Sequence, residues 1–165
     1  MDDYSLSDLT EITGLKRRTV QHWSEVGAIV AEASTERKGT GVHRRFSRRE
    51  AMIACLLAPY GTAQISIGQL LPLSMHLRDV LSRPGVMDLA EKCARGEARA
   101  FFTYALGAEI RTSASTSTQD LEYRLFPDEG DGQVEGHLGA YIASKAAEGM
   151  LVTAVELQTQ LRGFR

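Results

Sequence analysis

The chain has 165 residues, a formal net charge of -2 and 43% apolar residues, which is enough for one ordinary domain or two small ones with packed cores. It contains no apolar run of about eighteen or more residues and no secretory signal pattern, so a membrane span and a secreted protein are both disfavoured. We therefore expect a globular, cytoplasmic protein whose two cysteines, Cys55 and Cys93, are reduced thiols.

Charge is unevenly distributed along the chain. Nine basic residues and three acidic ones lie between Gly14 and Arg49, whereas six acidic residues and one basic residue lie between Asp120 and Glu135. The nine basic residues are Lys16, Arg17, Arg18, Arg37, Lys38, Arg44, Arg45, Arg48 and Arg49. Because local charge decides where a phosphate backbone can dock, the first segment is the candidate nucleic-acid surface.

The first predicted element is a short helix that begins after Ser5. The pattern Ser5-Leu6-Ser7-Asp8 is typical of a capping box, in which the Ser5 hydroxyl and the Asp8 carboxylate each accept a backbone N–H. Leu6, Leu9 and Ile12 then recur every three residues. Thr13-Gly14 predicts a turn in which glycine adopts a positive φ without steric cost.

A second helix is predicted from about Lys16 to Val26. Its apolar side carries Val20, Trp23 and Val26, so Trp23 is expected in the core rather than stacked on a base. Its other side carries Arg17, Arg18, Gln21, His22 and Glu25. Gly27 is expected to end the helix as its C′ residue.

The next segment predicts a basic hairpin. Residues 28–30 are expected to form a short strand, 31–42 the loop, and His43-Arg44-Arg45-Phe46 the returning strand. Ser47-Arg48-Arg49-Glu50 predicts a second capping box before a helix over 51–58. Arg48 and Arg49 at this helix start are expected either to bind phosphate or to be solvated.

Two prolines punctuate the middle of the chain. Pro59-Tyr60-Gly61 is expected to break the third helix, and a fourth helix is predicted over 66–81, with Pro72 either kinking it or beginning a new segment. Arg83-Pro84-Gly85 is expected to end this unit.

The second half of the chain predicts a mixture of helices and strands. A helix is expected at 86–95, strands at 100–106 and 121–126, loops at 112–118 and 128–132, an alanine-rich helix at 134–148, and either a buried strand or a last helix at 151–157. The predicted class is α+β: residues 1–82 form a winged helix-turn-helix DNA-binding domain, and residues 84–165 form a small mixed domain for dimerisation, ligand sensing or partner binding.

The order of these elements predicts a double-stranded DNA interface. A helix fits the major groove of B-DNA, while neighbouring loops contact phosphates and set the docking angle. The candidate DNA-binding residues are Lys16, Arg17, Arg18, Gln21 and His22 on the second helix, and Arg37, Lys38, His43, Arg44 and Arg45 on the hairpin.

Residues 4 to 81 resemble the MerR family of transcriptional regulators. The matching motifs are Tyr4-Ser5-Leu6, Thr13-Gly14-Leu15, Arg18-Thr19-Val20, His22-Trp23, Glu25-Val26-Gly27, the wing segment from Gly41 to Ser47, and Ile65-Ser66-Ile67-Gly68-Gln69-Leu70. The resemblance implies that Arg18 contacts DNA, that Trp23 packs beneath the recognition helix and that Arg44 contacts the phosphate backbone. His22 stands where the family usually has Tyr. No heptad pattern follows Pro84, where the family usually has a long dimerisation helix.

We expect a sequence-specific transcriptional regulator that binds palindromic DNA as a homodimer in the nucleoid. RNA polymerase or a small-molecule effector is a candidate further partner. Two other classes stay open: an architectural or phage DNA-binding protein, such as an excisionase or a small packaging subunit, and a protein-interaction adaptor that has lost DNA binding.

No catalytic or metal-binding pattern is found in the sequence. It has no nucleophile with a nearby base, no paired carboxylates and no glycine-rich phosphate loop in a supporting context. No cofactor, metal or enzymatic activity is therefore expected. Cys93 is expected to be an apolar filler, with redox sensing as the alternative.

Overall fold

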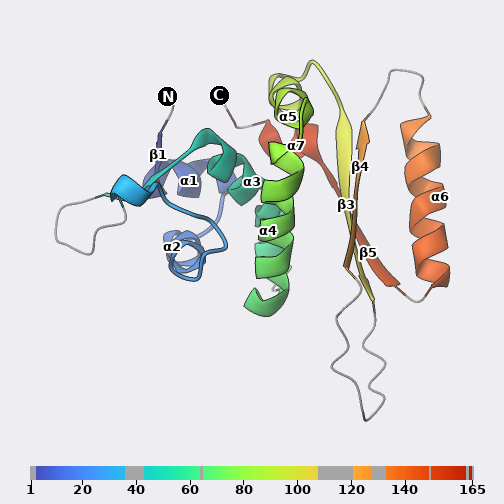
Figure 1. The fold of residues 1–165 in the computed structure, drawn as a ribbon, viewed down its shortest axis with the longest axis horizontal. Helices are drawn as coiled ribbons and strands as arrows, with labels where there is room; N and C mark the ends of the chain where they lie inside the picture. The colour runs from blue at the N-terminus through green and yellow to red at the C-terminus, as the bar shows by residue number, and fades with distance from the viewer. Residues whose placement is uncertain are drawn as a thin grey trace, which may run out of the picture.

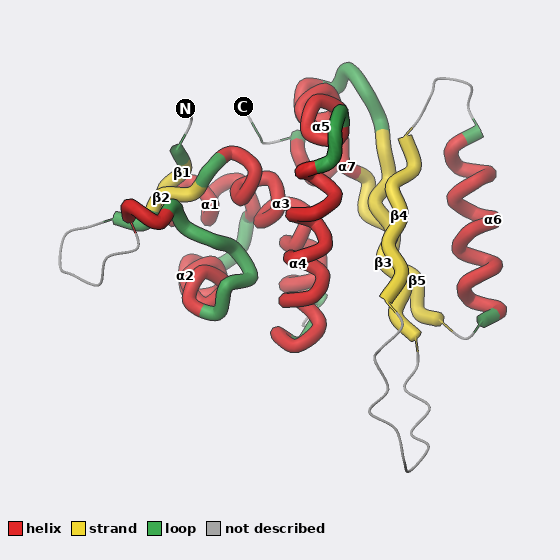
Figure 2. The backbone as a smooth tube through the Cα atoms, viewed as in Figure 1, coloured by secondary structure: helices red, strands yellow, loops and turns green. Residues whose placement is uncertain are grey.

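A computed structural model describes residues 3–35, 43–63, 65–107, 121–127, 133–148, 150–162 and 164. Within these residues the chain is mostly helical, with two small antiparallel sheets (Figures 1 and 2). The α+β class predicted from the sequence is confirmed at this level.

Helices account for most of the described elements. They are α1 (Leu6–Thr13), α2 (Arg17–Glu25), the 3-10 helix η1 (Ala33–Thr35), α3 (Arg48–Thr62), α4 (Ile67–Ser82), α5 (Val86–Arg95), α6 (Val134–Ala147) and α7 (Leu157–Leu161). The strands are β1 (Tyr4–Ser5), β2 (Arg45–Phe46), β3 (Ala100–Gly107), β4 (Leu121–Pro127) and β5 (Met150–Glu156).

The predicted capping box and glycine turn at the start of the chain are confirmed. The Ser5 hydroxyl accepts the Asp8 N–H at 3.2 Å, and the Asp8 carboxylate accepts the Ser5 N–H at 2.7 Å. Gly14 has a φ of 66° between α1 and α2, and Gly27 has a φ of 81° directly after the C-cap of α2. These two glycines, both in the left-handed conformation, therefore allow the chain to turn before α2 and after it.

The hairpin predicted between residues 28–30 and 43–46 is wrong. β2 pairs instead with β1, with Tyr4 opposite Phe46 and Ser5 opposite Arg45. Residues 28–30 do not form a strand because their backbone donors are used elsewhere: the Ile29 N–H donates to the Trp23 carbonyl at 3.3 Å, and the Val30 N–H donates to the Glu50 carboxylate at 2.8 Å. Residues 36–42 of the predicted loop lie outside the described part of the chain.

The helix break predicted at 59–61 is also wrong, because α3 continues to Thr62. Pro59 lies in the last turns of α3, where it removes a single backbone donor. The next side chain, Tyr60, is buried in the core. Only half of the predicted second capping box forms. The Ser47 hydroxyl accepts the Glu50 N–H at 3.3 Å, but the Glu50 carboxylate points into the protein.

An ion pair between the buried Glu50 and the partly buried Arg78 connects α3 and α4 to the chain that leaves α2. Arg78 donates to both carboxylate oxygens of Glu50, at 2.7 and 3.0 Å, and to the carbonyl of Ala28 at 2.8 Å. The Glu50 side chain is only 7% exposed. The Val30 N–H donates to the same carboxylate. These hydrogen bonds offset the energetic cost of burying the Glu50 charge. We call these contacts the Glu50–Arg78 network.

The C-terminal half follows the sequence prediction closely. α4 is continuous through Pro72, and the helix and strands expected at 86–95, 100–106 and 121–126 are present. Residues 151–157, predicted as a buried strand or the start of a last helix, form most of β5, and Leu157 begins α7. The loops predicted at 112–118 and 128–132 lie outside the described residues.

The three-stranded sheet has the order β4-β3-β5 and is antiparallel throughout. α6 lies on one side of this sheet and α4, α5 and α7 lie on the other side (Figure 1). α7 packs against both α5 and α3, which brings the C-terminal segment next to the N-terminal helices.

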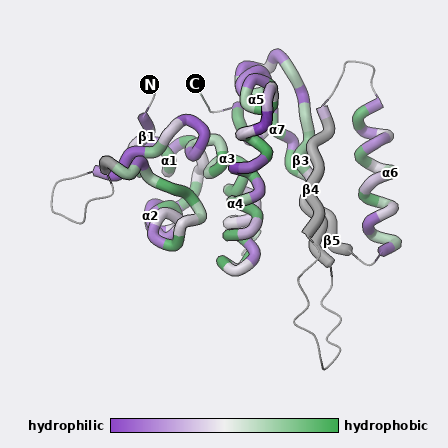
Figure 3. The backbone as a smooth tube through the Cα atoms, in the orientation of Figure 1, coloured by the Kyte–Doolittle hydropathy of each residue, from purple (hydrophilic) through white to green (hydrophobic). Residues whose placement is uncertain are grey.

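A single cluster of buried apolar side chains joins the two halves of the chain. It contains Leu9, Trp23 and Leu56 from the N-terminal helices together with Leu157 and Phe164 from the C-terminal segment. Hydrophobic residues are especially dense along α3, whose middle turns are buried (Figure 3). The last helix therefore completes the core beside α3 and α5, while the predicted division into two domains stays a prediction.

Arg48 has a structural role that the sequence did not indicate. Its guanidinium donates to both Glu91 oxygens, at 2.5 and 2.8 Å, and to the Tyr4 hydroxyl at 2.9 Å. It also lies 4.7 Å from the centre of the Phe164 ring. Arg48 therefore connects β1, α3, α5 and the C-terminal segment, and is neither a solvated side chain nor a free phosphate ligand.

Gly61 is required by close packing against Trp23. A methyl group at this position would lie 2.6 Å from Cζ2 of the Trp23 ring, so Gly61→Ala should lower the free energy of unfolding by about 1–3 kcal/mol. Gly136→Ala on α6 is the matched control, because its added methyl meets open space and should raise stability by up to ~1 kcal/mol. Urea unfolding followed by circular dichroism measures both variants, and equal stabilities would contradict this packing.

The Arg48–Glu91 ion pair should make stability depend on pH. The hydrogen bond from Arg48 holds the pKa of Glu91 below its ordinary value of 4.5. A depressed carboxyl pKa stabilises the fold above pH 4.5, and this contribution is lost as the pH falls through the folded-state pKa.

Glu91→Gln should therefore lower the free energy of unfolding by about 1 kcal/mol at pH 7, with the difference from wild type shrinking on acidification. Denaturant titrations from pH 7 to pH 3 provide the measurement. Asp79→Asn removes the exposed ion pair with Arg83 and serves as a control with a smaller effect. A Glu91→Gln deficit that is the same at both pH values would refute the assignment.

Candidate nucleic-acid interface

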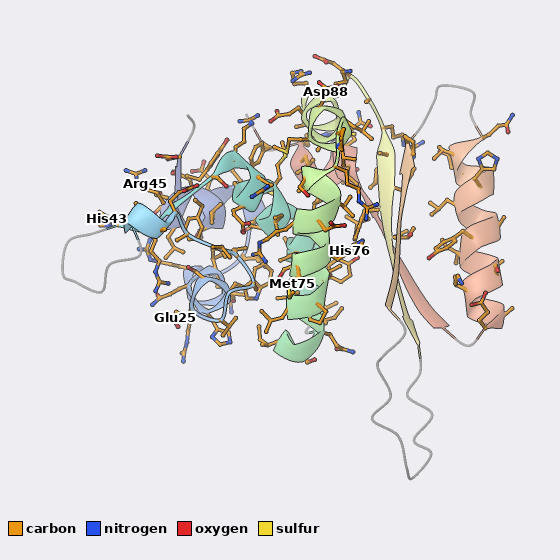
Figure 4. All side chains as sticks on the ribbon, in the orientation of Figure 1. Glu25, His43, Arg45, Met75, His76 and Asp88 are labelled. Atoms are coloured by element: carbon orange, nitrogen blue, oxygen red, sulfur yellow. The ribbon has the colours of Figure 1, made fainter. Side chains whose placement is uncertain are left out.

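α2 has one buried side and one exposed side. Val20 and Trp23 are buried, at 0% and 3% exposure, which confirms the predicted core position of Trp23. The opposite side exposes Lys16, Arg17, Arg18, Gln21 and His22, all of them predicted site residues. α2 lies at one end of the molecule, away from the three-stranded sheet (Figure 4).

The start of α2 concentrates positive charge. Its N-cap is Lys16, whose side chain makes no capping hydrogen bond, and the first turn contains no acidic residue. Arg17 and Arg18 follow directly. Because the amide groups at a helix N-terminus already carry partial positive charge, these cations are unfavourable for the isolated helix and favour an anionic partner.

Two arginines of this region are oriented by hydroxyl groups rather than by carboxylates. Arg17 donates to the Ser7 hydroxyl on α1 at 2.9 Å, and Arg44 donates to the Ser24 hydroxyl on α2 at 3.1 Å. A hydroxyl group fixes the guanidinium in place without neutralising its charge. Both side chains therefore keep a full positive charge and further N–H donors.

The contact between Arg44 and Ser24 also brings the predicted wing segment to α2. One open hollow is lined by Lys16, Arg17, Arg18, Thr19, Gln21, His22 and Glu25, and a second by Ser5, Leu6, Ser7, Arg17, Gln21, Glu25, His43 and Arg44. Three residues, Arg17, Gln21 and Glu25, line both. We call this continuous surface, from Lys16 to Glu25 with His43 and Arg44, the α2 face.

The remaining predicted site residues lie apart from the α2 face or outside the described chain. Arg45 is exposed on β2 but lines neither hollow. Figure 4 shows Arg45 and His43 at the same end of the molecule as Glu25. Arg37 and Lys38 fall among the residues that the structure does not describe.

Ion pairing distinguishes two sets of described cations. Arg48, Arg78, Arg83, Arg95 and Arg99 each pair with a carboxylate. Within the described residues, none of the five cations at the α2 end of the molecule does so: Lys16, Arg17, Arg18, Arg44 and Arg45. Arg49 and Arg162 form no ion pair in the described part of the chain either, but the largest group of such cations is the one around α2.

A second group of arginines lies outside the α2 face and differs from it in ion pairing. Arg48, Arg95 and Arg162 line a hollow between the end of α5 and α7. Glu91 pairs with Arg48, and Glu97 pairs with Arg95 at 2.7 Å. Because two of the three cations are already neutralised, this hollow is a weaker site for a polyanion than the α2 face.

Sequence reasoning missed three residues of this surface. Ser7 and Ser24 orient the arginines, and Glu25 accepts a hydrogen bond from Gln21 at 2.9 Å. The four-residue spacing of Gln21 and Glu25 on one helix could have indicated their contact. The serine contacts depend on how α1 and β2 pack against α2, which no local pattern encodes.

Both cysteines are free and buried. Burial raises the pKa of Cys55 to about 12 and also raises the pKa of Cys93. The thiolate is the reactive form of cysteine, so these environments keep both side chains protonated and disfavour redox chemistry at either position. Their packing in the core agrees with the apolar-filler interpretation.

Comparisons with known proteins do not place the chain in a family. No protein-family model matches it, and no curated protein matches it by sequence. None of the helices in the described ranges is long and apolar enough to cross a membrane. Among the same residues, no group of three or more His, Cys, Asp and Glu side chains is arranged to hold a metal ion.

Proposed function

We propose that the chain is a sequence-specific double-stranded DNA-binding protein that regulates transcription. α1, the Gly14 turn and α2 would act as a helix-turn-helix, with α2 in the major groove and the chain around His43 and Arg44 along the backbone. The observation that carries this proposal is the cluster of cations around α2 that form no ion pair with a carboxylate of the described residues.

The dimensions of α2 suit the major groove. A helix with its side chains is about 10–12 Å across, and the major groove of B-DNA is about 12 Å wide. The exposed side of α2 offers guanidinium and amide groups, which donate and accept hydrogen bonds at base edges. Its N-terminal residues would enter the groove first, as in other helix-turn-helix proteins.

The arginines at the edges of the α2 face suit phosphate contacts. Arg17 and Arg44 both line the second hollow and are oriented by Ser7 and Ser24. Fixed, un-neutralised guanidinium groups bind phosphate oxygens through charge-assisted hydrogen bonds and release counterions from the duplex. These contacts would set the orientation of α2, and base contacts would supply specificity.

The resemblance to MerR-type regulators supports the same proposal, because its motifs fall on α1, α2, β2 and the start of α4. A helix-turn-helix of this size buries limited DNA surface, so we propose that two copies bind a palindromic site in the nucleoid. RNA polymerase or a small-molecule effector would be the further partner of such a regulator.

Replacing Arg18 or Arg44 by Ala should weaken binding to a selected duplex by at least ~1 kcal/mol, and the Arg44 change should also flatten the salt dependence. Fluorescence anisotropy at several salt concentrations measures both quantities. Arg83→Ala, which breaks an exposed ion pair on the other side of the molecule, is the matched control and should leave both unchanged. If both test variants keep the wild-type affinity and the wild-type dependence of affinity on salt, the proposal is wrong.

A further inference from the structure

The exposed side of α2 carries three polar residues in a straight line along the helix. Arg18, Gln21 and Glu25 are all exposed, and they stand three and then four residues apart. Residues at this spacing lie on one face of a helix, one above another. From one end to the other, this stripe changes from a guanidinium group to an amide and then to a carboxylate.

Glu25 is chemically different from the rest of the α2 face. Among the described residues that line the two hollows, it is the one carboxylate. Although Arg17 and Arg44 line the same hollow, neither forms an ion pair with it. Glu25 therefore does not serve to neutralise the cations around it.

Gln21 holds the Glu25 side chain in position. Its amide nitrogen donates to one Glu25 oxygen at 2.9 Å. A carboxylate has about four acceptor positions, so the second oxygen and a further lone pair remain available. The hydrogen bond thus orients a hydrogen-bond acceptor toward the surface that α2 presents.

A carboxylate is unfavourable against DNA unless it accepts a hydrogen bond. Guanine and thymine present acceptor oxygens in the major groove, which repel a carboxylate, whereas the amino groups of cytosine and adenine donate to it. Adenine also places its N7 acceptor beside the N6 amino group, so cytosine is the more favourable partner for a carboxylate. A residue that rejects the wrong base by repulsion contributes to specificity as much as one that attracts the right base.

On the basis of the function proposed above, we infer that Glu25 is a specificity-determining residue that accepts a hydrogen bond from the N4 amino group of a cytosine. Arg18 would donate to a guanine at the other end of the stripe. The two residues are seven positions apart, which is about 10 Å along a helix, so they would contact different base pairs. The binding site should therefore contain separate guanine and cytosine contacts.

The test is selection of binding sites from a random duplex library by the full-length protein, followed by sequencing. Wild type, Glu25→Ala and Glu25→Gln are compared, with Glu11→Ala on the exposed side of α1 as the matched control. Wild type and Glu11→Ala should select one position as cytosine. Glu25→Ala should lose the preference at that position alone and keep the rest of the motif.

Affinity measurements on the selected duplex then quantify the effect. Changing the selected C·G pair to T·A should weaken wild-type binding at least about fivefold and Glu25→Ala binding by less than about twofold. If Glu25→Ala keeps the full cytosine preference, the inference about Glu25 is wrong while the proposed function stands. If wild type enriches no motif at all, the proposed function itself fails.

Discussion

The position of α2 depends on the buried contact between Glu50 and Arg78. This network attaches the carbonyl of Ala28 and the N–H of Val30, both in the chain that leaves α2, to α3 and α4. The buried Trp23 side chain holds α2 against the core, where Gly61 leaves room for its ring. A buried ion pair with unsatisfied hydrogen bonds would destabilise the fold, but here each charged group has several partners. The structure therefore presents α2 on a rigid support and keeps its polar side exposed.

The same chain uses arginine in two different ways. Arg48 and Arg78 are joined to carboxylates and stabilise contacts between helices that are distant in the sequence. Arg17 and Arg44 are joined to serine hydroxyls, which orient them and leave their charge intact. A net charge of -2 is therefore compatible with binding a polyanion, because most of the described acidic partners lie away from α2. Ion pairing, rather than the number of arginines, distinguishes the two sets.

Local patterns in the sequence predicted α1, α2, α5, the glycine turns and the first capping box, because each depends on residues within a few positions of one another. The errors have non-local causes. Residues 28–30 are apolar enough for a strand, but the distant Glu50 takes the Val30 N–H. Arg48 looked available for phosphate until the fold brought Glu91 beside it. Exposure of the α2 side chains followed from periodicity, whereas their tethering by Ser7 and Ser24 required the packed structure.

The proposed DNA complex places the α2 face against the duplex. A titration of isotope-labelled protein with a selected duplex, followed by the backbone and arginine side-chain NMR signals, tests this placement. The largest shifts should fall on residues 16–25 and on Arg44, with smaller changes across α6. Shifts concentrated on α6 or around Arg95 and Arg162, with the α2 signals unmoved, would contradict it.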